Sequence, residues 1–154
     1  MTVTKIISGG QTGADRAALD VAINLGIPHG GWVPKGRRTE DGKLGDKYQM
    51  KEMPTFNYPD RTEKNVLDSD GTLILSHGKL TGGSSLTRKL AKEHNRAWIH
   101  IDMDSLSVHQ AARTIRTWIS RHEIGILNVA GPTAGKDPEI YEAATTVLKA
   151  VFES

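Results

Sequence analysis

Short apolar runs alternate with longer amphipathic segments along the sequence. The apolar runs are rich in β-branched residues and leucine and are bounded by glycine, proline or polar residues, which is typical of buried strands. They lie at residues 3–8, 30–34, 72–75, 97–101 and 125–129. The pattern therefore predicts about five strands.

Between the strands, apolar residues recur three and four positions apart, which is the spacing of one face of an α-helix. The segments with this spacing are 15–25, 61–67, 86–91, 106–122 and 138–151. We expect Thr62 and Asp137 to act as N-caps, with Pro138 at the first position of the last helix. Residues 43–60 have no clear period, and a loop of that length is usually functional. Strands that alternate with helices predict an α/β fold with a parallel sheet.

Three of the predicted strands end in a glycine-rich turn. These turns lie at residues 8–16, 81–88 and 130–138. Right-handed crossovers place the turns after parallel strands along one edge of the sheet, where open α/β sheets bind ligands. Glycine lets a backbone approach an anion closely, and the N–H groups at a helix start attract negative charge. We therefore expect a cleft for an anionic ligand about the size of a nucleotide, although each turn alone could be a tight connection without a ligand.

Residues in and near these turns are the candidate ligand contacts. Along the chain, the predicted binding residues are Gly9, Gly10, Gln11, Thr12, Gly13, Asp15, Arg16, Arg38, His77, Gly82, Gly83, Ser84, Ser85, Arg88, Gly131 and Pro132. Arg16, Arg38 and Arg88 are the expected partners of the ligand's charge, because arginine binds phosphate through two parallel hydrogen bonds. The alternative for Arg38 and Arg88 is a solvated position, and the alternative for Asp15 is a favourable charge at a helix start.

Composition and motif spacing narrow the possible chemistry. The absence of cysteine excludes disulfides, thiolate catalysis and cysteine-based zinc sites. The six histidines show no zinc-site spacing, so no metal site is predicted, and His77 is the one best placed for the cleft, just after a strand. Ser84 and Ser85 lack the G-x-S-x-G pattern of a nucleophilic serine. Without an evident catalytic carboxylate in the turns, the residues favour binding over catalysis.

Charge and hydropathy bear on the partners. The formal net charge is +2 and aromatic residues make up 5% of the chain, so few rings are available for base stacking and a nucleic-acid partner is not favoured. No apolar run approaches the length of a membrane span, and the first residues do not have the pattern of a secretory leader. We expect a cytoplasmic protein without a membrane partner, and 154 residues are most simply one domain.

The glycine-rich turns also resemble those of a known family. The segments Ser8–Asp15, Arg61–Thr72, Thr81–Ser85 and Asn128–Pro132 are similar to the molybdenum carrier family. That family belongs to a Rossmann-like group, the SLOG superfamily, which includes YpsA, DprA and the LOG phosphoribohydrolases. The resemblance spans nearly the whole chain and implies a Rossmann-like three-layer α/β/α domain over residues 1–154 with a mainly parallel sheet.

The resemblance implies a carrier or binding protein. Its ligand would be the molybdenum cofactor, a pterin that carries a phosphate and a metal oxyanion, or a nucleotide. Proteins of this group are often oligomeric, which implies a homodimer or homotetramer. The alternative is a LOG-like phosphoribohydrolase that cleaves the N-glycosidic bond of a nucleoside monophosphate. Arg88 and Lys89 stand where LOG enzymes carry a catalytic glutamate, which argues against that activity unless Asp15 takes its place.

Overall fold

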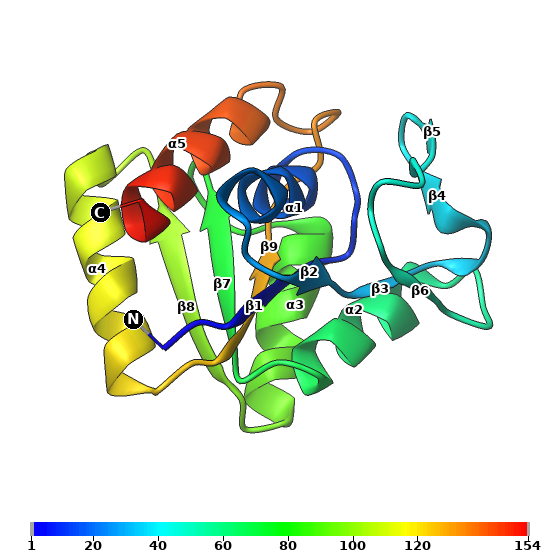
Figure 1. Ribbon diagram of the computed structural model, residues 1–154, viewed down its shortest axis with the longest axis horizontal. Coiled ribbons are helices and arrows are strands. Elements are labelled where there is room, and N and C mark those ends of the chain that lie inside the picture. Colours follow the sequence, from blue (N-terminus) through cyan, green and yellow to red (C-terminus); the bar gives the residue numbers. More distant parts are fainter. Residues whose placement is uncertain (1, 154) are drawn as a thin grey trace.

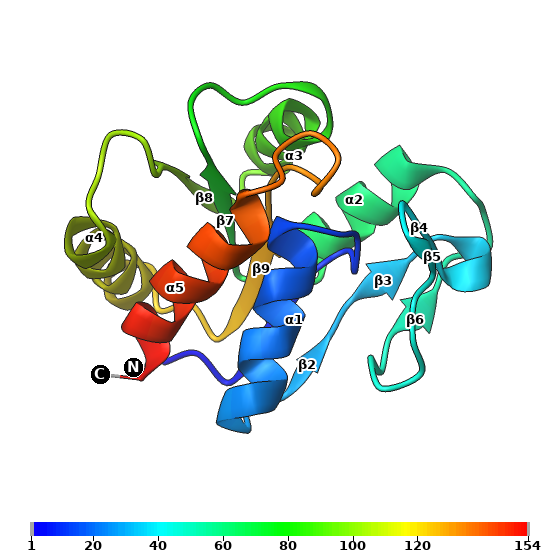
Figure 2. The same ribbon diagram turned by 90° about the horizontal axis from the view of Figure 1, so that it is seen from above.

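A computed structural model of the chain describes residues 2–153, and its centre is a parallel sheet of five strands in the order β2-β1-β9-β7-β8. The strands are β1 (Lys5–Ile7), β2 (His29–Gly30), β7 (Gly71–Ser76), β8 (Ala97–Asp102) and β9 (Ile126–Ala130). The sheet lies between two layers of helices, seen best in Figure 2. One layer holds α1 (Ala14–Leu25), α4 (Val108–Arg121) and α5 (Ile140–Phe152), and the other holds α2 (Tyr58–Leu67) and α3 (Gly82–Glu93). The predicted three-layer α/β/α fold is confirmed.

The strand order places the three glycine-rich segments next to one another. The last strand in the chain, β9, lies between β1 and β7 at the centre of the sheet (Figure 1). These three neighbouring parallel strands are the ones that the glycine-rich segments follow. Outward from them, the chain runs from β1 to β2 on one side and from β7 to β8 on the other. Such a reversal of strand order leaves a crevice at the carboxyl edge of an open sheet.

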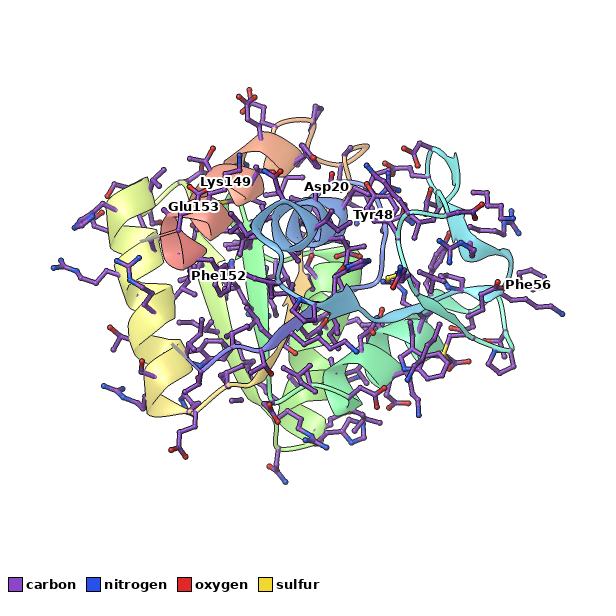
Figure 3. The ribbon with its side chains drawn as sticks, viewed as in Figure 1. Asp20, Tyr48, Phe56, Lys149, Phe152 and Glu153 are labelled. Atoms are coloured by element: carbon purple, nitrogen blue, oxygen red, sulfur yellow. The ribbon has the colours of Figure 1, made fainter. Side chains whose placement is uncertain are left out.

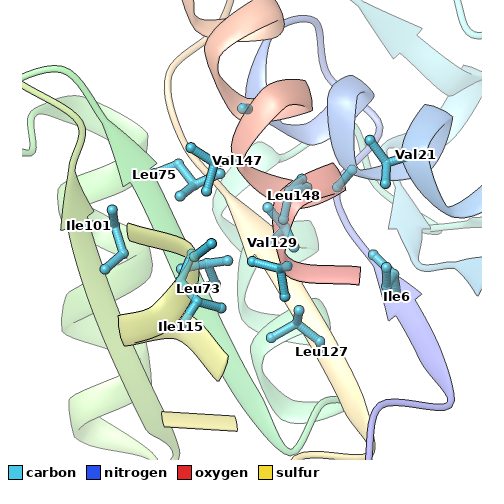
Figure 4. Close-up of a cluster of buried hydrophobic side chains, with 14 of the residues drawn as sticks. Ile6, Val21, Leu73, Leu75, Ile101, Ile115, Leu127, Val129, Val147 and Leu148 are labelled. Carbon is cyan, nitrogen blue, oxygen red and sulfur yellow. The ribbon is translucent and has the colours of Figure 1, made fainter. Parts of the chain in front are cut away.

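The hydrophobic core fills the space between the sheet and the α1–α4–α5 layer. Figure 4 shows side chains of the central strands packed against side chains of α4 and α5. Among them, Leu73, Leu127 and Val129 of the strands and Ile115 and Leu148 of the helices have no solvent-exposed surface. Strands with a helix layer on each face are buried on both sides, which is why their sequences read as continuous apolar runs.

Residues 31–57 form an arm beyond the β2 edge of the sheet (Figures 1 and 2). Within the arm, β3 (Trp32–Val33) pairs with β6 (Lys51–Glu52), a short 3-10 helix spans Lys35–Arg37, and β4 (Arg38–Thr39) and β5 (Gly42–Lys43) form a hairpin. The expectation of one strand over 30–34 is wrong, because the chain turns at Gly31 with φ +122° and leaves the main sheet there. A side chain at Gly31 would clash with the Ser8 carbonyl.

The arm packs on α1 through a small core of its own. Leu19 of α1 contacts a buried cluster that includes Val33, Leu44 and Tyr48 of the arm. The Tyr48 hydroxyl donates to Asp20 of α1 at 2.6 Å, and Figure 3 labels both residues where the arm meets the helix layer. Phe56 lies at the outer end of the arm and is 57% exposed (Figure 3). The arm is therefore anchored at the end that lies near the glycine-rich turns.

Three helix starts differ from the sequence-based expectation. Helix α2 begins at Tyr58, three residues before the predicted segment, because Asn57 accepts a hydrogen bond from the Asp60 N–H and serves as the N-cap instead of Thr62. Helix α3 begins at Gly82, so most of the predicted 81–88 turn is helical. Helix α5 begins at Ile140, and Asp137 is not its N-cap.

Over residues 2–153, none of the helices combines the length and the apolar character that crossing a bilayer requires.

Candidate functional site

A cavity of about 420 Å³ lies at the carboxyl ends of β1, β9 and β7, and we call it the main cavity. Its walls come from the turn after β1, the end of β9 and the first turns of α2 and α3. The predicted binding residues that line it are Gly9, Gln11, Asp15, Gly82, Gly83, Ser84 and Gly131. The three glycine-rich segments therefore do meet at one cavity, at the edge of the sheet where the sequence predicts a cleft.

The other predicted binding residues do not line the main cavity. They are Gly10, Thr12, Gly13, Arg16, Arg38, His77, Ser85, Arg88 and Pro132. Gly13 illustrates the reason, because its backbone lies so close to the Pro132 carbonyl that a side chain there would clash. Because the two turns pack directly on each other, the residues at their contact are not available to line the cavity.

The turn after β1 has most of its N–H groups occupied by the protein itself. The Gly10 N–H donates to Ser8 Oγ, the Gln11 N–H to Asp15 Oδ2 and the Thr12 N–H to Gln11 Oε1, over 3.0–3.3 Å. These three amides therefore already have acceptors within the turn, whereas the Gly9 N–H has none among the described residues, and Gly9 lines the main cavity. The Asp15 carboxylate accepts from the Gln11 N–H and so takes the place that the anionic group of a ligand could occupy.

The turn after β9 is occupied by a carboxylate from the arm. Oε1 of Glu40 accepts from the Thr12 hydroxyl at 2.7 Å and from the Gly135 N–H at 2.8 Å. The Ala134 N–H donates to Thr12 Oγ1. Hydrogen bonds from Thr12, Thr133 and Gly135 lower the pKa of Glu40, so this carboxylate is charged at neutral pH. The tip of the β4–β5 hairpin is thereby attached to both turns.

The three arginines expected to face the ligand lie elsewhere. Arg16 donates to the Gly10 carbonyl and pairs with Asp41 of the arm at 3.2 Å. Arg38 is exposed, with its guanidinium 5.9 Å from the ring centroid of Phe56. Arg88 lies on α3 and does not line the main cavity. Its positive charge contributes to lowering the pKa of His100 on β8, after the larger effect of burial.

Asp15 is the ionisable group buried most deeply at the main cavity. Only 6% of the residue is exposed, and Oδ2 lies 3.4 Å from Nη1 of Arg61. Burial raises the pKa of Asp15 to about 6, and the Arg61 guanidinium limits that rise by favouring the charged form. A carboxyl group whose pKa lies near 6 can change its protonation state near neutral pH, which is the property a general acid or base needs.

Arg61 of α2 is a cavity residue that the sequence analysis did not select. It lines the main cavity, its side chain is 11% exposed, and its buried Nε has no hydrogen-bond partner among the described residues. The guanidinium lies directly on the backbone of Gly9, where any side chain would clash with it. Gly9 therefore makes room for Arg61. The one sequence signal was that Arg61 begins a segment of the family resemblance, but nothing local placed it over the first turn.

The first turn of α3 differs from the other two glycine-rich segments because no carboxylate of the described residues occupies its amides. Thr81 is the N-cap without a side-chain cap, and its carbonyl accepts from the Ser84 and Ser85 N–H groups. Over residues 2–153, the N–H groups of Gly82 and Gly83 find no acceptor. Both glycines and Ser84 line the main cavity. These groups and the Arg61 guanidinium provide a positively polarised end of the cavity.

Apolar groups line much of the rest of the main cavity. Tyr58, Pro59, Leu86 and Val129 contribute to its walls. The Tyr58 ring is 42% exposed, and the Arg61 guanidinium lies 5.5 Å from its centroid. An aromatic ring beside a cation, next to open amide donors, suits a molecule with a flat ring at one end and a negative charge at the other.

Metal-binding side chains are not clustered near this cavity. Among residues 2–153, no group of three or more histidine or acidic residues has the geometry to hold a metal ion. His77 instead pairs through Nδ1 with Asp137 Oδ2 at 2.6 Å. The other oxygen of Asp137, Oδ1, accepts from the N–H of Glu139, the residue just before α5.

The strand order and the cavity at the carboxyl edge of the sheet define a Rossmann-like α/β protein. Residues 6–152 match the circularly permutated YpsA SLOG family, and the chain belongs to that family. The crystal structure of "Putative molybdenum carrier protein" from Syntrophus aciditrophicus SB is similar to it at 58% sequence identity, with a TM-score of 0.97. That likeness covers 98% of this chain and 96% of the other. No curated protein matches the chain.

Proposed function

We propose that this protein binds a small molecule that carries a phosphate or similar oxyanion on a flat heterocycle, the class that includes nucleotides and the molybdenum cofactor. The observation that carries the proposal is the polar end of the main cavity. There the unpartnered Nε of the buried Arg61 and the open N–H groups of Gly82 and Gly83 line one space. A buried polar atom nearly always has a partner, so the Arg61 guanidinium fits an acceptor that the ligand brings, and the exposed N–H groups of Gly82 and Gly83 can donate to the same acceptor.

The chemistry of these groups favours an oxyanion. A guanidinium presents planar pairs of N–H groups that match phosphate oxygens, and a helix start adds backbone donors and a favourable dipole. The volume of about 420 Å³ is within the range of small-molecule sites, roughly 300–1,000 Å³. The Tyr58 ring offers a surface on which a flat heterocycle can stack.

The molybdenum cofactor fits these residues through its phosphate and its ring. The similar protein from Syntrophus aciditrophicus SB is named as a molybdenum carrier, which supports this ligand for the present chain. Arg61, Gly82 and Gly83 would hold the phosphate, and Tyr58 would lie against the pterin. The cofactor supplies redox chemistry to enzymes that receive it, and a carrier needs only to hold and release it.

The first experiment is native mass spectrometry of freshly purified protein. The expected result is a bound mass, released on denaturation, that contains phosphorus. The same spectrum gives the oligomeric state, for which we propose a homodimer or homotetramer. A protein that carries no ligand and, after dialysis, shows no binding of AMP by calorimetry would contradict the proposal.

Arg61→Ala tests the residue that carries the proposal. We expect AMP affinity to fall about 30-fold or more, because removing one partner of a buried charge pair costs roughly 2–5 kcal/mol. Arg61→Lys keeps the charge and should retain part of the affinity if the variant is folded. Arg88→Ala is the matched control, since Arg88 does not line the main cavity. Equal AMP affinity in wild type and Arg61→Ala would contradict the assignment.

A phosphoribohydrolase is the second candidate, and Asp15 is the observation that favours it. Arg88 and Lys89, at the positions of the LOG glutamate, do not line the main cavity, whereas Asp15 does and has a pKa of about 6. A carboxylate beside the sugar would stabilise the positive charge that develops when an N-glycosidic bond breaks. The test is release of free base from AMP, followed by chromatography. Release that Asp15→Asn abolishes supports the enzyme, and no release from wild type excludes it for AMP.

A further inference from the structure

A second, smaller cavity of about 110 Å³ lies beside the main cavity, and we call it the side pocket. Ser84 lines both spaces, so the first turn of α3 lies between them. The turn after β9 is shared in the same way, since Gly131 and Thr133 face the main cavity while Pro132 faces the side pocket. The two spaces are therefore neighbours around the same open helix start.

The side pocket contains more positive charge than negative. Lys79, Lys136 and His77 line it, and Asp137 is its one carboxylate. Asp137 is hydrogen-bonded to His77 at 2.6 Å, and that bond raises the pKa of His77 and so favours the charged imidazole. Within residues 2–153, neither Lys79 nor Lys136 forms an ion pair. The charge of the two lysines is thus not balanced by the pocket.

The exposed side chain of Lys136 reaches the start of α3. Its Nζ lies against Gly82, where a side chain on the glycine would clash with it. Gly82 is the first residue of α3, and the start of a helix carries a partial positive charge. A cation held there repels the helix dipole, whereas an anion between the two would interact favourably with both.

Ser84 provides a separate indication that a ligand reaches this place. The residue is 7% exposed, and its hydroxyl forms no hydrogen bond with any of the described residues. Ser84 lines both cavities, and its hydroxyl oxygen is open to them rather than enclosed by the protein. Its hydroxyl is therefore placed to donate to an acceptor that lies between them.

We propose that the side pocket binds a second anionic group of the ligand in the main cavity, so that within the proposed class a diphosphate ester is preferred to a ligand with a single phosphate such as the molybdenum cofactor. This inference rests on the proposed function, since the first phosphate is the one held by Arg61 and the start of α3. Ser84 contacts the junction between the two phosphates, and Lys79 and Lys136 neutralise the outer one. The class of ligand is a heterocycle carrying a diphosphate.

The test compares AMP with ADP by isothermal titration calorimetry on wild type, Lys136→Ala and Lys89→Ala. Lys89 is the matched control, because it is an exposed lysine on α3 that lines neither cavity. We expect wild type to bind ADP about tenfold more tightly than AMP, which is the usual effect of hydrogen bonds to a charged group. Lys136→Ala should lower ADP affinity more than AMP affinity and so remove the preference for ADP, and Lys89→Ala should change neither affinity.

Two results would overturn the inference, and they differ in what they say of the main cavity. If AMP binds in a way that depends on Arg61 but ADP binds no more tightly, the side pocket takes no phosphate and the proposed function stands. If neither nucleotide binds to wild type, both conclusions fail for nucleotide ligands. An ADP preference that Lys136→Ala leaves intact would also assign the second phosphate to a place other than the side pocket.

Discussion

Two kinds of glycine-rich segment meet at the main cavity, and they differ in whether a carboxylate of the protein accepts from their amides. In the turns after β1 and β9, the amides of Gln11 and Gly135 donate to Asp15 and Glu40. In the first turn of α3, the amides of Gly82 and Gly83 have no acceptor within residues 2–153. All three segments look alike in sequence, since each combines glycine with hydroxyl residues after a buried strand.

The difference teaches that glycine in such a turn has two separate uses. Gly13 and Gly131 allow backbone and side chains to pack closely, because a Cβ at Gly131 would lie 2.5 Å from the Leu75 carbonyl oxygen. A Cβ at Gly83 would have no other atom within 4 Å, so this glycine is not needed to avoid a steric clash. Close packing fixes the two turns, and the open helix start is left to receive a ligand.

Gly13→Ala should give the largest effect on stability. Gly13 has φ +81°, a conformation that side chains disfavour, and the added methyl group would clash with the Pro132 carbonyl. We expect a loss of about 3 kcal/mol or more in the free energy of unfolding. Chemical denaturation followed by circular dichroism measures it. A change below about 1 kcal/mol would show that this turn is not held by close packing.

Asp15 should make stability depend on pH in the acidic range. The unfolded carboxyl has the ordinary value of 3.8 and the folded one has a pKa of about 6, so the native state binds the proton more tightly. The resulting stabilisation is fully present below about pH 4 and is lost as the pH rises through 6, by up to about 3 kcal/mol.

Asp15→Asn isolates this contribution because asparagine cannot titrate. Urea denaturation from pH 4 to 7.5 should show wild type losing stability relative to Asp15→Asn as the pH rises. Parallel curves for the two proteins would mean that the carboxylate is not buried against the first turn as described.

Thr12→Val should give a medium effect, confined to the contact between the two packed turns. The Thr12 hydroxyl donates to Glu40 and accepts from the Ala134 N–H, and valine has a similar shape without the oxygen. We expect a loss of about 1–2 kcal/mol, the cost of leaving such groups without partners. The measurement is the unfolding midpoint, with AMP affinity determined in parallel. A large fall in AMP affinity without a change in stability would place a ligand on these turns instead.

Gly83→Ala should have the smallest effect and the opposite sign. The added methyl group meets no neighbour, and alanine restricts the unfolded chain more than glycine does. A gain of about 0.5 kcal/mol is expected by the same denaturation experiment. A loss comparable to that of Gly13→Ala would remove the distinction between the two kinds of segment.

Much of the fold follows from the sequence because the signals for it are local. The apolar runs at 72–75 and 97–101 became β7 and β8 almost unchanged, and the spacing over 106–122 became α4. The alternation of these elements gave the parallel sheet and the shared edge for the turns. The position of the cavity was therefore predictable even though the order of the strands was not.

The groups that fill or line the cavity were less predictable because they come from distant segments. Arg61 reaches Asp15 across 46 positions, and Glu40 reaches Gly135 across 95. Nothing in the local sequence of either residue indicates its partner. Arg16, Arg38 and Arg88 looked suitable from their neighbours in the chain, but tertiary packing directs them away from the main cavity.

The most direct measurement is a crystal structure of the protein with AMP bound. The account predicts that the phosphate lies within hydrogen-bond distance of the Gly82 and Gly83 N–H groups and of the Arg61 guanidinium, with Asp15 and Glu40 still on their own turns. A phosphate that accepts from Gln11 or Gly135, after displacing Asp15 or Glu40, would contradict it.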